Sequence, residues 1–312
     1  MEYKVKDILS VLPKNYELLG NEDLKFTSID PIFEAKEGSL SWIRSNLLNA
    51  EIIYRNSKAS IIICDKKINI SSDLHFSNCI IRVDKPEIAF LKIVKHLYGD
   101  CSIKNSFFHP SAIIHPEAEI GENVYIGEFC VIQRCKIGTG TIIESYSKIH
   151  DNVFIGENVI IYDHCNIGGQ GFGFELNEQN VQENMLHIGR VVIGDNVEIF
   201  PFCNVDKATL SNTEIGKNTK IDHYCHIGHN TSIGTNSLIT AKTTLCGGSG
   251  VGDNVYIGVG TIIRDSLFVG NDAFVGIGSL VTKNIPHGEK WAGNPARPVD
   301  ELKKLNLKLK SL

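Results

Sequence analysis

The chain has 312 residues, of which 42% are hydrophobic and 21% charged, which excludes wholesale disorder. Its net charge of −5, without a basic tract, argues against nucleic acid or an anionic membrane as a partner. No apolar run reaches the ~18–20 residues that span a bilayer. The start MEYKVKDILS is too polar for a signal peptide. Nine cysteines without a CxxC pair indicate reduced thiols in a cytoplasmic protein.

Residues 1–104 have the pattern of a small α/β domain. A helical stripe opens the chain, formed by Val5, Ile8, Leu9 and Leu12. Residues 59–64 and 79–83 are predicted to be buried strands. Asp84 is expected to cap a helix over 86–98, whose inward side chains should be Ile88, Leu91 and Leu97.

An internal repeat of six residues dominates residues 105–287. From residue 215 an aliphatic side chain occupies every sixth position: Ile215, Ile221, Ile227, Ile233, Ile239, Leu245, Val251, Ile257, Ile263, Val269, Val275 and Val281. The same period runs from Ile114 to Ile132, from Ile137 to Ile167 and from Ile193 to Val205. A period of six matches neither a helix face nor one long strand, so it predicts three short strands per turn of a solenoid.

A second period of 18 residues supports three strands per coil. Glycines recur at this spacing, at Gly216, Gly234, Gly252 and Gly270, and two residues after each lies Asn218, Asn236, Asn254 or Asp272. Gly, Asn and Asp tolerate positive φ, so these residues mark one corner of a triangular coil. The hexads make about eight coils, which at ~4.8 Å per coil give a prism roughly 40 Å long.

Two insertions interrupt the coil and are candidates for binding loops. Twenty extra residues lie between Ile167 and Ile193, within the excursion loop 168–187. Four extra residues lie between Val205 and Ile215. After the coil, residues 288–312 form a tail that is expected to be helical from Asp300.

Stacking of coils brings residue i beneath residue i+18, and this suggests a catalytic pair. His229 would lie beneath Gly247, and Gly247 beneath Asp265. A neutral imidazole can take a proton from an attacking amine or hydroxyl, and a backbone N–H can hold the resulting oxyanion. Two alternatives stay open: His229 is an ordinary exposed histidine, or it belongs to a zinc site with His223 and His226.

The hexads resemble the hexapeptide-repeat acyltransferases, and this resemblance implies a left-handed parallel β-helix with an N-terminal α/β domain and a short C-terminal helix. The ordered series of a GFGF excursion, HIGRVVIGDNVEI, NVDKATL and IDHYCHIGHNTSIG resembles, more specifically, the UDP-3-O-acylglucosamine N-acyltransferases of lipid A synthesis. That resemblance implies a homotrimer that binds no permanent cofactor. It would acylate the amine of a UDP-linked amino sugar from a phosphopantetheine thioester.

The resemblance also implies roles for individual residues. His229 would be the general base and Gly247 the oxyanion donor. The N-terminal domain would bind uridine, with Trp42 stacking on uracil and Asn46 beside it. Further substrate contacts are expected from Phe172, Asp222 and His226, and donor contacts from Asp265 and Ser266, the latter at a position that the family fills with a second histidine.

Several features depart from the family pattern. Gln170 stands where an acidic residue is common, the asparagine after the aromatic is displaced by one position, and the following proline is absent. The ending WAGNPAR resembles acetyl-coenzyme A sugar acetyltransferases and would place Arg297 near coenzyme A phosphates. The donor is therefore either acyl carrier protein, favoured by the longer resemblance and by tail lysines (Lys303, Lys304, Lys308, Lys310), or acyl-coenzyme A. Alternatives outside this class are a non-catalytic β-helix and a zinc hydratase.

Overall fold

The computed structural model describes residues 2–45, 47–68, 78–99 and 104–310. The chain divides into two compact units, residues 1–103 and 104–312, called here the N-terminal unit and the coil unit. Within the described residues, no helix is long and apolar enough to cross a membrane.

The N-terminal unit is built on a five-stranded sheet with the order β2-β7-β6-β5-β4. Its strands are β2 (Glu17–Leu19), β4 (Ser28–Ile29), β5 (Ser39–Trp42), β6 (Ile61–Asp65) and β7 (Cys79–Val83). Strands β4 to β7 are parallel, and β2 joins β7 antiparallel. The remaining elements are β1 (Tyr3–Lys4) paired with β3 (Lys25–Phe26), α1 (Val5–Leu9), α2 (Ala50–Asn56) and α3 (Pro86–Tyr98).

Helix α3 has the predicted bounds, but its cap and its inward face differ from the prediction. Lys85 occupies the N-cap without a side-chain bond, while Asp84 accepts a hydrogen bond from Asn15 Nδ2 at 2.6 Å. Ile88 and Leu91 are exposed, and the buried side chains are Pro86, Ala89 and Ile93. Apolar residues lie on more than one side of this helix, so contact with the sheet, rather than periodicity, selects the buried face.

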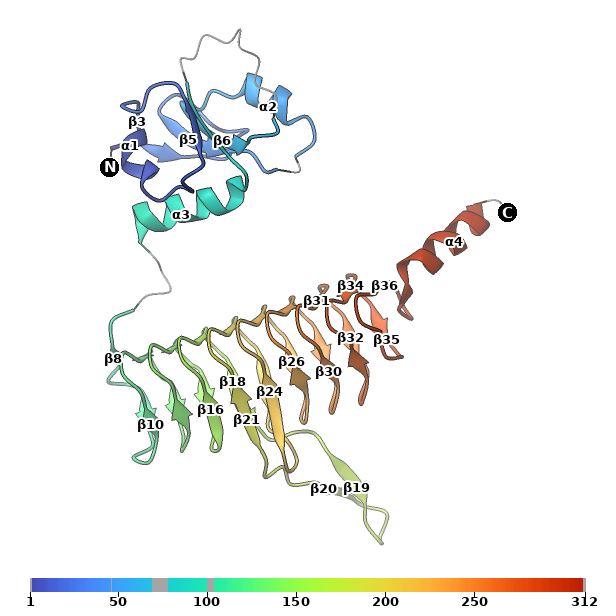
Figure 1. The fold of residues 1–312 in the computed structure, drawn as a ribbon. Coiled ribbons are helices and arrows are strands. Elements are labelled where there is room, and N and C mark those ends of the chain that lie inside the picture. The colour runs from blue at the N-terminus through green and yellow to red at the C-terminus, as the bar shows by residue number, and fades with distance from the viewer. Residues whose placement is uncertain (1, 46, 69–77, 100–103, 311–312) are drawn as a thin grey trace. The chain divides into compact units, whose positions relative to one another are not determined.

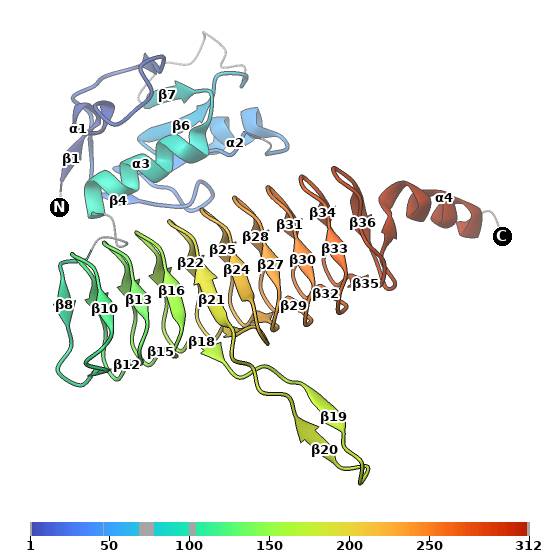
Figure 2. The same cartoon turned by 60° about the horizontal axis from the view of Figure 1, so that its bottom comes forward.

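The coil unit is a parallel β-helix with three sheets, named I to III in the order in which the chain visits them (Figures 1 and 2). Sheet I contains β8 (Phe107–Phe108), β11 (Tyr125–Ile126), β14 (Ile142–Ile143), β17 (Ile160–Ile161), β22 (Glu198–Ile199), β25 (Lys220–Ile221), β28 (Leu238–Ile239), β31 (Tyr256–Ile257), β34 (Phe274–Val275), β36 (Lys290–Ala292) and the antiparallel β37 (Arg297–Pro298). Sheet II contains β9 (Ile113–Ile114), β12 (Val131–Ile132), β15 (Lys148–Ile149), β18 (Asn166–Gly169), β23 (Asn204–Asp206), β26 (His226–Ile227), β29 (Thr244–Leu245), β32 (Ile262–Ile263) and β35 (Leu280–Val281). Sheet III contains β10 (Glu119–Ile120), β13 (Lys136–Ile137), β16 (Val153–Ile155), β21 (Arg190–Ile193), β24 (Asn212–Ile215), β27 (Ser232–Ile233), β30 (Gly250–Val251) and β33 (Phe268–Val269). Helix α4 (Val299–Lys310) follows the coil.

The strand register confirms the hexad prediction. Ile239 pairs with Ile257, 18 residues on, and the aliphatic hexad residues from Ile126 to Val281 are at most 5% exposed. Burial of each such side chain contributes ~1.5–3 kcal/mol. On sheet III, Ile155 pairs with Ile193 and Ile193 with Ile215, so both insertions leave the coil without disturbing the columns.

The two insertions emerge near one another. The longer one forms a hairpin of β19 (Phe174–Leu176) and β20 (Gln182–Asn184), which projects away from the coil (Figure 2). The shorter one follows β23, where the pairing of Gly169 with Asp206 shifts the register. Lys207 N then donates to Gly169 O at 2.9 Å, which ties the start of one insertion to the other.

Positive φ occurs at all three corners of the coil, beyond the one corner that the sequence marks. At the III/I corner it falls on the predicted Asn218, Asn236 and Asn254. At the I/II corner it falls on an aromatic ladder, Phe129, Tyr146, His164, Phe202 and Tyr224, whose successive rings stack 4.8–5.2 Å apart. A left-handed conformation costs ~1–2 kcal/mol for such residues, and ring stacking of ~0.5–1.5 kcal/mol per pair offsets much of it.

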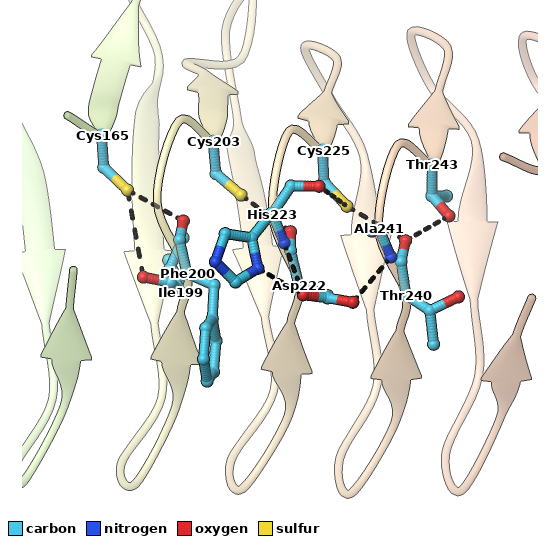
Figure 3. A network of polar contacts seen from close by, with 10 residues as sticks. All are labelled: Cys165, Ile199, Phe200, Cys203, Asp222, His223, Cys225, Thr240, Ala241 and Thr243. Atoms are coloured by element: carbon cyan, nitrogen blue, oxygen red, sulfur yellow. Dashed lines mark hydrogen bonds and ion pairs between the residues drawn. The ribbon is translucent and has the colours of Figure 1, made fainter. Parts of the chain in front are cut away.

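Inside the I/II corner, buried thiols donate to backbone carbonyls of the next coil, and the hydroxyl of Thr243 donates to Thr240 O of its own coil (Figure 3). Cys165 Sγ lies 3.2 Å from Phe200 O, and Cys203 Sγ lies 3.1 Å from Asp222 O. Burial raises the pKa of Cys165 to about 12, so this thiol stays protonated and donates. The eight cysteines that the structure describes are all free.

The hexad register can be tested with one inward and one outward substitution. Ile257→Asp places an unpaired carboxylate in the core, where Ile257 is fully buried, and should cost at least ~3 kcal/mol. Lys242→Asp, at an exposed corner with φ of 60°, should change stability by no more than ~0.5 kcal/mol, since Asp tolerates this conformation. Equal melting temperatures for the two variants would contradict the register.

Candidate functional site

His229 lies at the II/III corner, directly after β26, with its ring against Gly247 of the next coil. The register pairs Ile227 with Leu245, and Gly248 N donates to His229 O at 2.8 Å. A Cβ placed on Gly247 would lie 2.5 Å from His229 Nε2 and 2.7 Å from Cε1. Gly247 is not in the left-handed region, so glycine is needed here for space. The predicted stacking of these two residues is therefore present in the structure.

The excursion loop packs on His229 from its other side. A Cβ on Gly171 would lie 2.8 Å from His229 Cβ and 2.7 Å from His187 Nε2. The ring of His187, at the end of the loop, meets the ring of His229 nearly edge to face, with centroids 4.7 Å apart and planes at 65°. His187 is 2% exposed. Sequence reasoning did not select His187, because nothing in a 20-residue loop predicts which of its residues returns to the coil.

The shorter insertion is held beside His229 by Asn230. Thr209 N donates to Asn230 Oδ1 at 2.7 Å, and Asn230 Nδ2 donates to Thr209 Oγ1 at 3.2 Å. Asn230 N in turn donates to Thr213 Oγ1 at 3.0 Å. Asn230 was also missed from the sequence, although its position after His229 and its left-handed φ of 59° were a usable signal.

A row of polar side chains crosses sheet II towards this corner. His150 Nε2 lies 2.8 Å from Asn166 Oδ1, and Asn166 Nδ2 donates to Asn204 Oδ1 at 2.7 Å. Asn204 Nδ2 donates to Asp206 Oδ1 at 2.6 Å. Asp206 is 6% exposed, and its other oxygen lies 3.8 Å from His226 Nε2. Asp206 is thus a buried carboxylate next to the histidines. Its position at the start of the second insertion did not predict this burial.

The environment favours the neutral form of His229. Burial lowers the pKa of His229 below its ordinary value of 6.5, and the neighbouring His187 and His226 lower it further. The carboxylate of Asp206 and the backbone carbonyl of Phe172 act in the opposite direction. Burial also raises the pKa of Asp206. The balance gives an imidazole suited to accept a proton at neutral pH.

The predicted donor-binding residues fall into two places. Ser266 N donates to Gly247 O at 3.1 Å, so Asp265 and Ser266 continue the column of His229 and Gly247. Asp265 is exposed, with Arg264 Nε 3.8 Å from its carboxylate. Arg297 is on β37, which pairs with β36. Strand β36 lies four strands of sheet I beyond β25, the strand that precedes β26 and His229. Arg297 is therefore roughly 20 Å along the coil from the coil of His229. It lines a cavity of about 240 Å³ with Trp291 and Pro295.

Asp222 is at the I/II corner, at the opposite end of β26 from His229. Its carboxylate accepts from His223 N at 2.8 Å and from Ala241 N at 3.0 Å, and it lies 2.7 Å from His223 Nδ1 (Figure 3). His226 is between the two corners, on the outer face of sheet II. The structure therefore separates His223, His226 and His229, and the described residues contain no cluster of three metal-ligating side chains.

Phe172 and Trp42 are in different units. Phe172 is 83% exposed and lines an open cavity of about 700 Å³ with Gly173, Phe174 and Gln182. Trp42, at the end of β5, is half-buried and stacks on Phe90 at 5.1 Å, with the Arg44 guanidinium 5.6 Å from its ring centroid. Asn46 lies outside the described residues.

The N-terminal unit also has a cavity of about 510 Å³, in which Phe33, Lys36 and Lys58 take part. Trp42 does not line this cavity. A ligand that stacks on Trp42 would therefore lie outside this cavity, against a ring that the Arg44 guanidinium already approaches.

Comparison with known proteins agrees with this architecture. The family model described as bacterial transferase hexapeptide (six repeats) matches residues 212–247, which include His229 and Gly247. UDP-3-O-acylglucosamine N-acyltransferase 1 of Francisella tularensis subsp. holarctica is 30% identical over 250 residues, covering 74% of this chain and 71% of that protein. The protein of the same name from Legionella pneumophila is 30% identical over 68% of this chain and 64% of its own length.

Solved structures give the same picture of the fold. The UDP-N-acetylglucosamine acyltransferase of Francisella novicida superposes with a TM-score of 0.57 at 26% identity, covering 64% of this chain and 73% of that one. LpxA from Acinetobacter baumannii follows with a TM-score of 0.56 at 25% identity, covering 63% and 76%. Taken with the hexad columns and the extent of the sequence match, these similarities show that the chain is an acyltransferase with a left-handed β-helix and belongs to the UDP-3-O-acylglucosamine N-acyltransferase family.

Proposed function

We propose that the protein transfers an acyl group from a phosphopantetheine thioester to the amine of a UDP-linked amino sugar, with His229 as the general base. The observation that carries this proposal is the contact of the His229 ring with Gly247, at a corner that both insertions approach. The names of the relatives, UDP-3-O-acylglucosamine N-acyltransferases, support the sugar and the attacked group.

The proposed reaction needs one proton carrier and one oxyanion donor. His229 Nε2 takes a proton from the amine as the amine nitrogen attacks the thioester carbonyl, forming the C–N bond. Gly247 N–H, which has no hydrogen-bond partner among the described residues, donates to the oxyanion. Collapse breaks the C–S bond, and the His229 cation returns its proton to the leaving thiolate. No covalent acyl-enzyme is required.

The donor is proposed to reach this corner along the column of Gly247, Asp265 and Ser266. This column is exposed at Asp265 and Gly248, so an extended phosphopantetheine arm has access to it. We favour acyl carrier protein over coenzyme A, because Lys303, Lys304 and Lys308 of α4 are exposed and match an acidic partner. Arg297 and its cavity favour coenzyme A instead, as in an acetyl-coenzyme A sugar acetyltransferase.

We propose contacts with the acceptor, the UDP-linked amino sugar, for each unit separately. In the coil unit, Phe172, Asp222 and His226 would contact the substrate, with the open apolar cavity beside Phe172 available to its acyl chain. In the N-terminal unit, Trp42 would stack on uracil.

We further propose that the enzyme works as a homotrimer. Copies of the chain would then bring together side chains, such as Asp222 and His229, that one coil holds at different corners.

Removal of the base tests the mechanism. His229→Ala should lower kcat by ~10²–10⁴, the usual contribution of a general base, with an unchanged melting temperature because the ring is outside the core.

In the wild type, kcat/KM should fall on acidification only below the ordinary histidine pKa, since the folded protein lowers the pKa of His229. Gly247→Ala should also reduce kcat, because its Cβ would displace the ring. Wild-type turnover in His229→Ala would disprove the assignment.

Nucleotide binding by the N-terminal unit can be followed through tryptophan. If Trp42 stacks on uracil, UDP should quench its fluorescence, and Trp42→Ala should weaken binding of the UDP-sugar by ~1 kcal/mol or more. Trp291 is the other tryptophan, so the signal that is lost in Trp42→Ala identifies the source. Unchanged affinity in this variant would move the nucleotide to another surface, for which the cavity at Lys36 and Lys58 is the first candidate.

An assay with two acyl donors in parallel identifies the one that the enzyme uses. Acetyl-coenzyme A and a 3-hydroxyacyl carrier protein are each offered with UDP-glucosamine that does or does not carry a 3-O-acyl group. We expect turnover with the carrier protein and the acylated sugar, and a rate that falls with salt because exposed charges are screened over ~8–10 Å. Efficient turnover with acetyl-coenzyme A alone would favour the acetyltransferase alternative and leave the role of His229 intact.

A further inference from the structure

Two buried ring nitrogens beside the active-site corner lack a hydrogen-bond partner among the described residues: Nδ1 of His229 and Nε2 of His187. They belong to rings that are already in contact, with centroids 4.7 Å apart. A buried polar atom without a partner is costly, so two such atoms on touching rings call for an explanation.

Two neighbours of His187 Nδ1 bear on which nitrogen of this ring can accept, and they favour different tautomers. His187 Nδ1 lies 2.9 Å from Met185 O. A carbonyl oxygen only accepts, so a bond to Met185 O requires the proton on Nδ1 and leaves a free lone pair on Nε2 of the neutral ring. Gln170 Nε2 donates to the same carbonyl at 3.0 Å and lies 2.9 Å from His187 Nδ1. An amide nitrogen only donates, so a bond from Gln170 to Nδ1 would instead put the proton of His187 on Nε2. The tautomer bonded to Met185 O is the one that leaves Nε2 of His187 able to accept.

We propose that His187 is a positioning residue for His229: its Nε2 accepts a hydrogen bond from Nδ1–H of His229. This proposal rests on the proposed function of His229 as the base. With its proton held on Nδ1, neutral His229 has its lone pair on Nε2, the atom beside Gly247. Neither nitrogen has a partner among the described residues of this structure, and catalytic hydrogen bonds often tighten only when the substrate is bound.

The bond would also stabilise the cation that forms during the reaction. When His229 takes the amine proton on Nε2, its Nδ1–H becomes a stronger donor to His187 Nε2. No proton leaves Nδ1 of His229, and His187 keeps its own proton on its Nδ1, which donates to Met185 O. His187 would thus have the role that the carboxylate has in a Ser-His-Asp triad: it orients the catalytic histidine and selects its tautomer.

Other groups that face His229 are less suited to this role. Asp206 is occupied by Asn204 at 2.6 Å, and its second oxygen faces His226 at 3.8 Å. His226 lies on the outer face of sheet II. The carbonyl of Phe172 is the competing acceptor, and it would select the same tautomer without His187. The test must therefore remove the acceptor nitrogen of His187 while keeping its bulk.

Two substitutions separate an acceptor from a space-filling residue. His187→Phe keeps a ring edge against His229 but has no acceptor, and His187→Gln keeps an acceptor oxygen at a similar reach. We expect His187→Phe to lower kcat ~10–100-fold, by analogy with hydrogen-bond partners that orient metal-ligating histidines, with little change in the KM of the sugar. His187→Gln should retain activity within a few-fold.

The readouts include one that does not depend on turnover. Histidine ¹⁵N spectra of the full chain should show neutral His229 with its proton on Nδ1 in the wild type and in His187→Gln, and mixed tautomers in His187→Phe. His164→Phe, which preserves a stacked ring in the distant aromatic ladder, serves as the matched control for a histidine replaced by phenylalanine, and melting temperatures check the fold of each variant.

The proposal is overturned if His187→Phe keeps wild-type kcat and the His229 tautomer, which would assign the orienting role to the Phe172 carbonyl. It is also overturned if the Gln and Phe variants lose activity equally with normal melting temperatures. If His229→Ala retains turnover, the proposed base is wrong, and the nitrogen spectra alone then decide whether His187 accepts from His229.

Discussion

Parallel stacking of the coils at ~4.8 Å, sealed by inward aliphatic side chains, is the constraint on which the rest of the molecule depends. Each coil can pair with the next only if every sixth residue points inward, and the columns from Ile126 to Val281 meet this condition. Because the register is rigid, an outward residue has a defined neighbour one coil away. His229 and Gly247 meet for this reason, although 18 residues separate them.

The same rigidity explains where the site is. Extra residues cannot be absorbed inside the prism, so the chain expels them as loops at a corner, and pairing resumes between Ile155 and Ile193 and between Ile193 and Ile215. The two loops emerge from neighbouring coils and are tied to each other and to Asn230. They pack against one histidine, which is only partly exposed, and its burial lowers its pKa.

The corners show how the coil tolerates unusual residues. Left-handed φ is expected at asparagine and glycine, but at the I/II corner it falls on aromatic side chains, whose stacking from coil to coil compensates for the backbone cost. Inward thiols such as Cys203 donate to carbonyls of the adjacent coil. The raised pKa of the Cys165 thiol fits this structural use, and Cys165 and Cys203 lie at the I/II corner, away from the chemistry proposed at the II/III corner.

The β-helix, the positions and lengths of both insertions and the stacking of His229 on Gly247 can be predicted from one sequence, because the period of six is enforced at every coil. The bounds of α3 can be predicted from its local pattern. Inside the loops and in the N-terminal unit no such period acts. The return of His187 to His229, the burial of Asp206, the outward side of Ile88 and Leu91 and the cap of α3 depend on contacts between segments far apart in sequence. These features follow from tertiary packing, which selects among positions that local preference leaves equivalent.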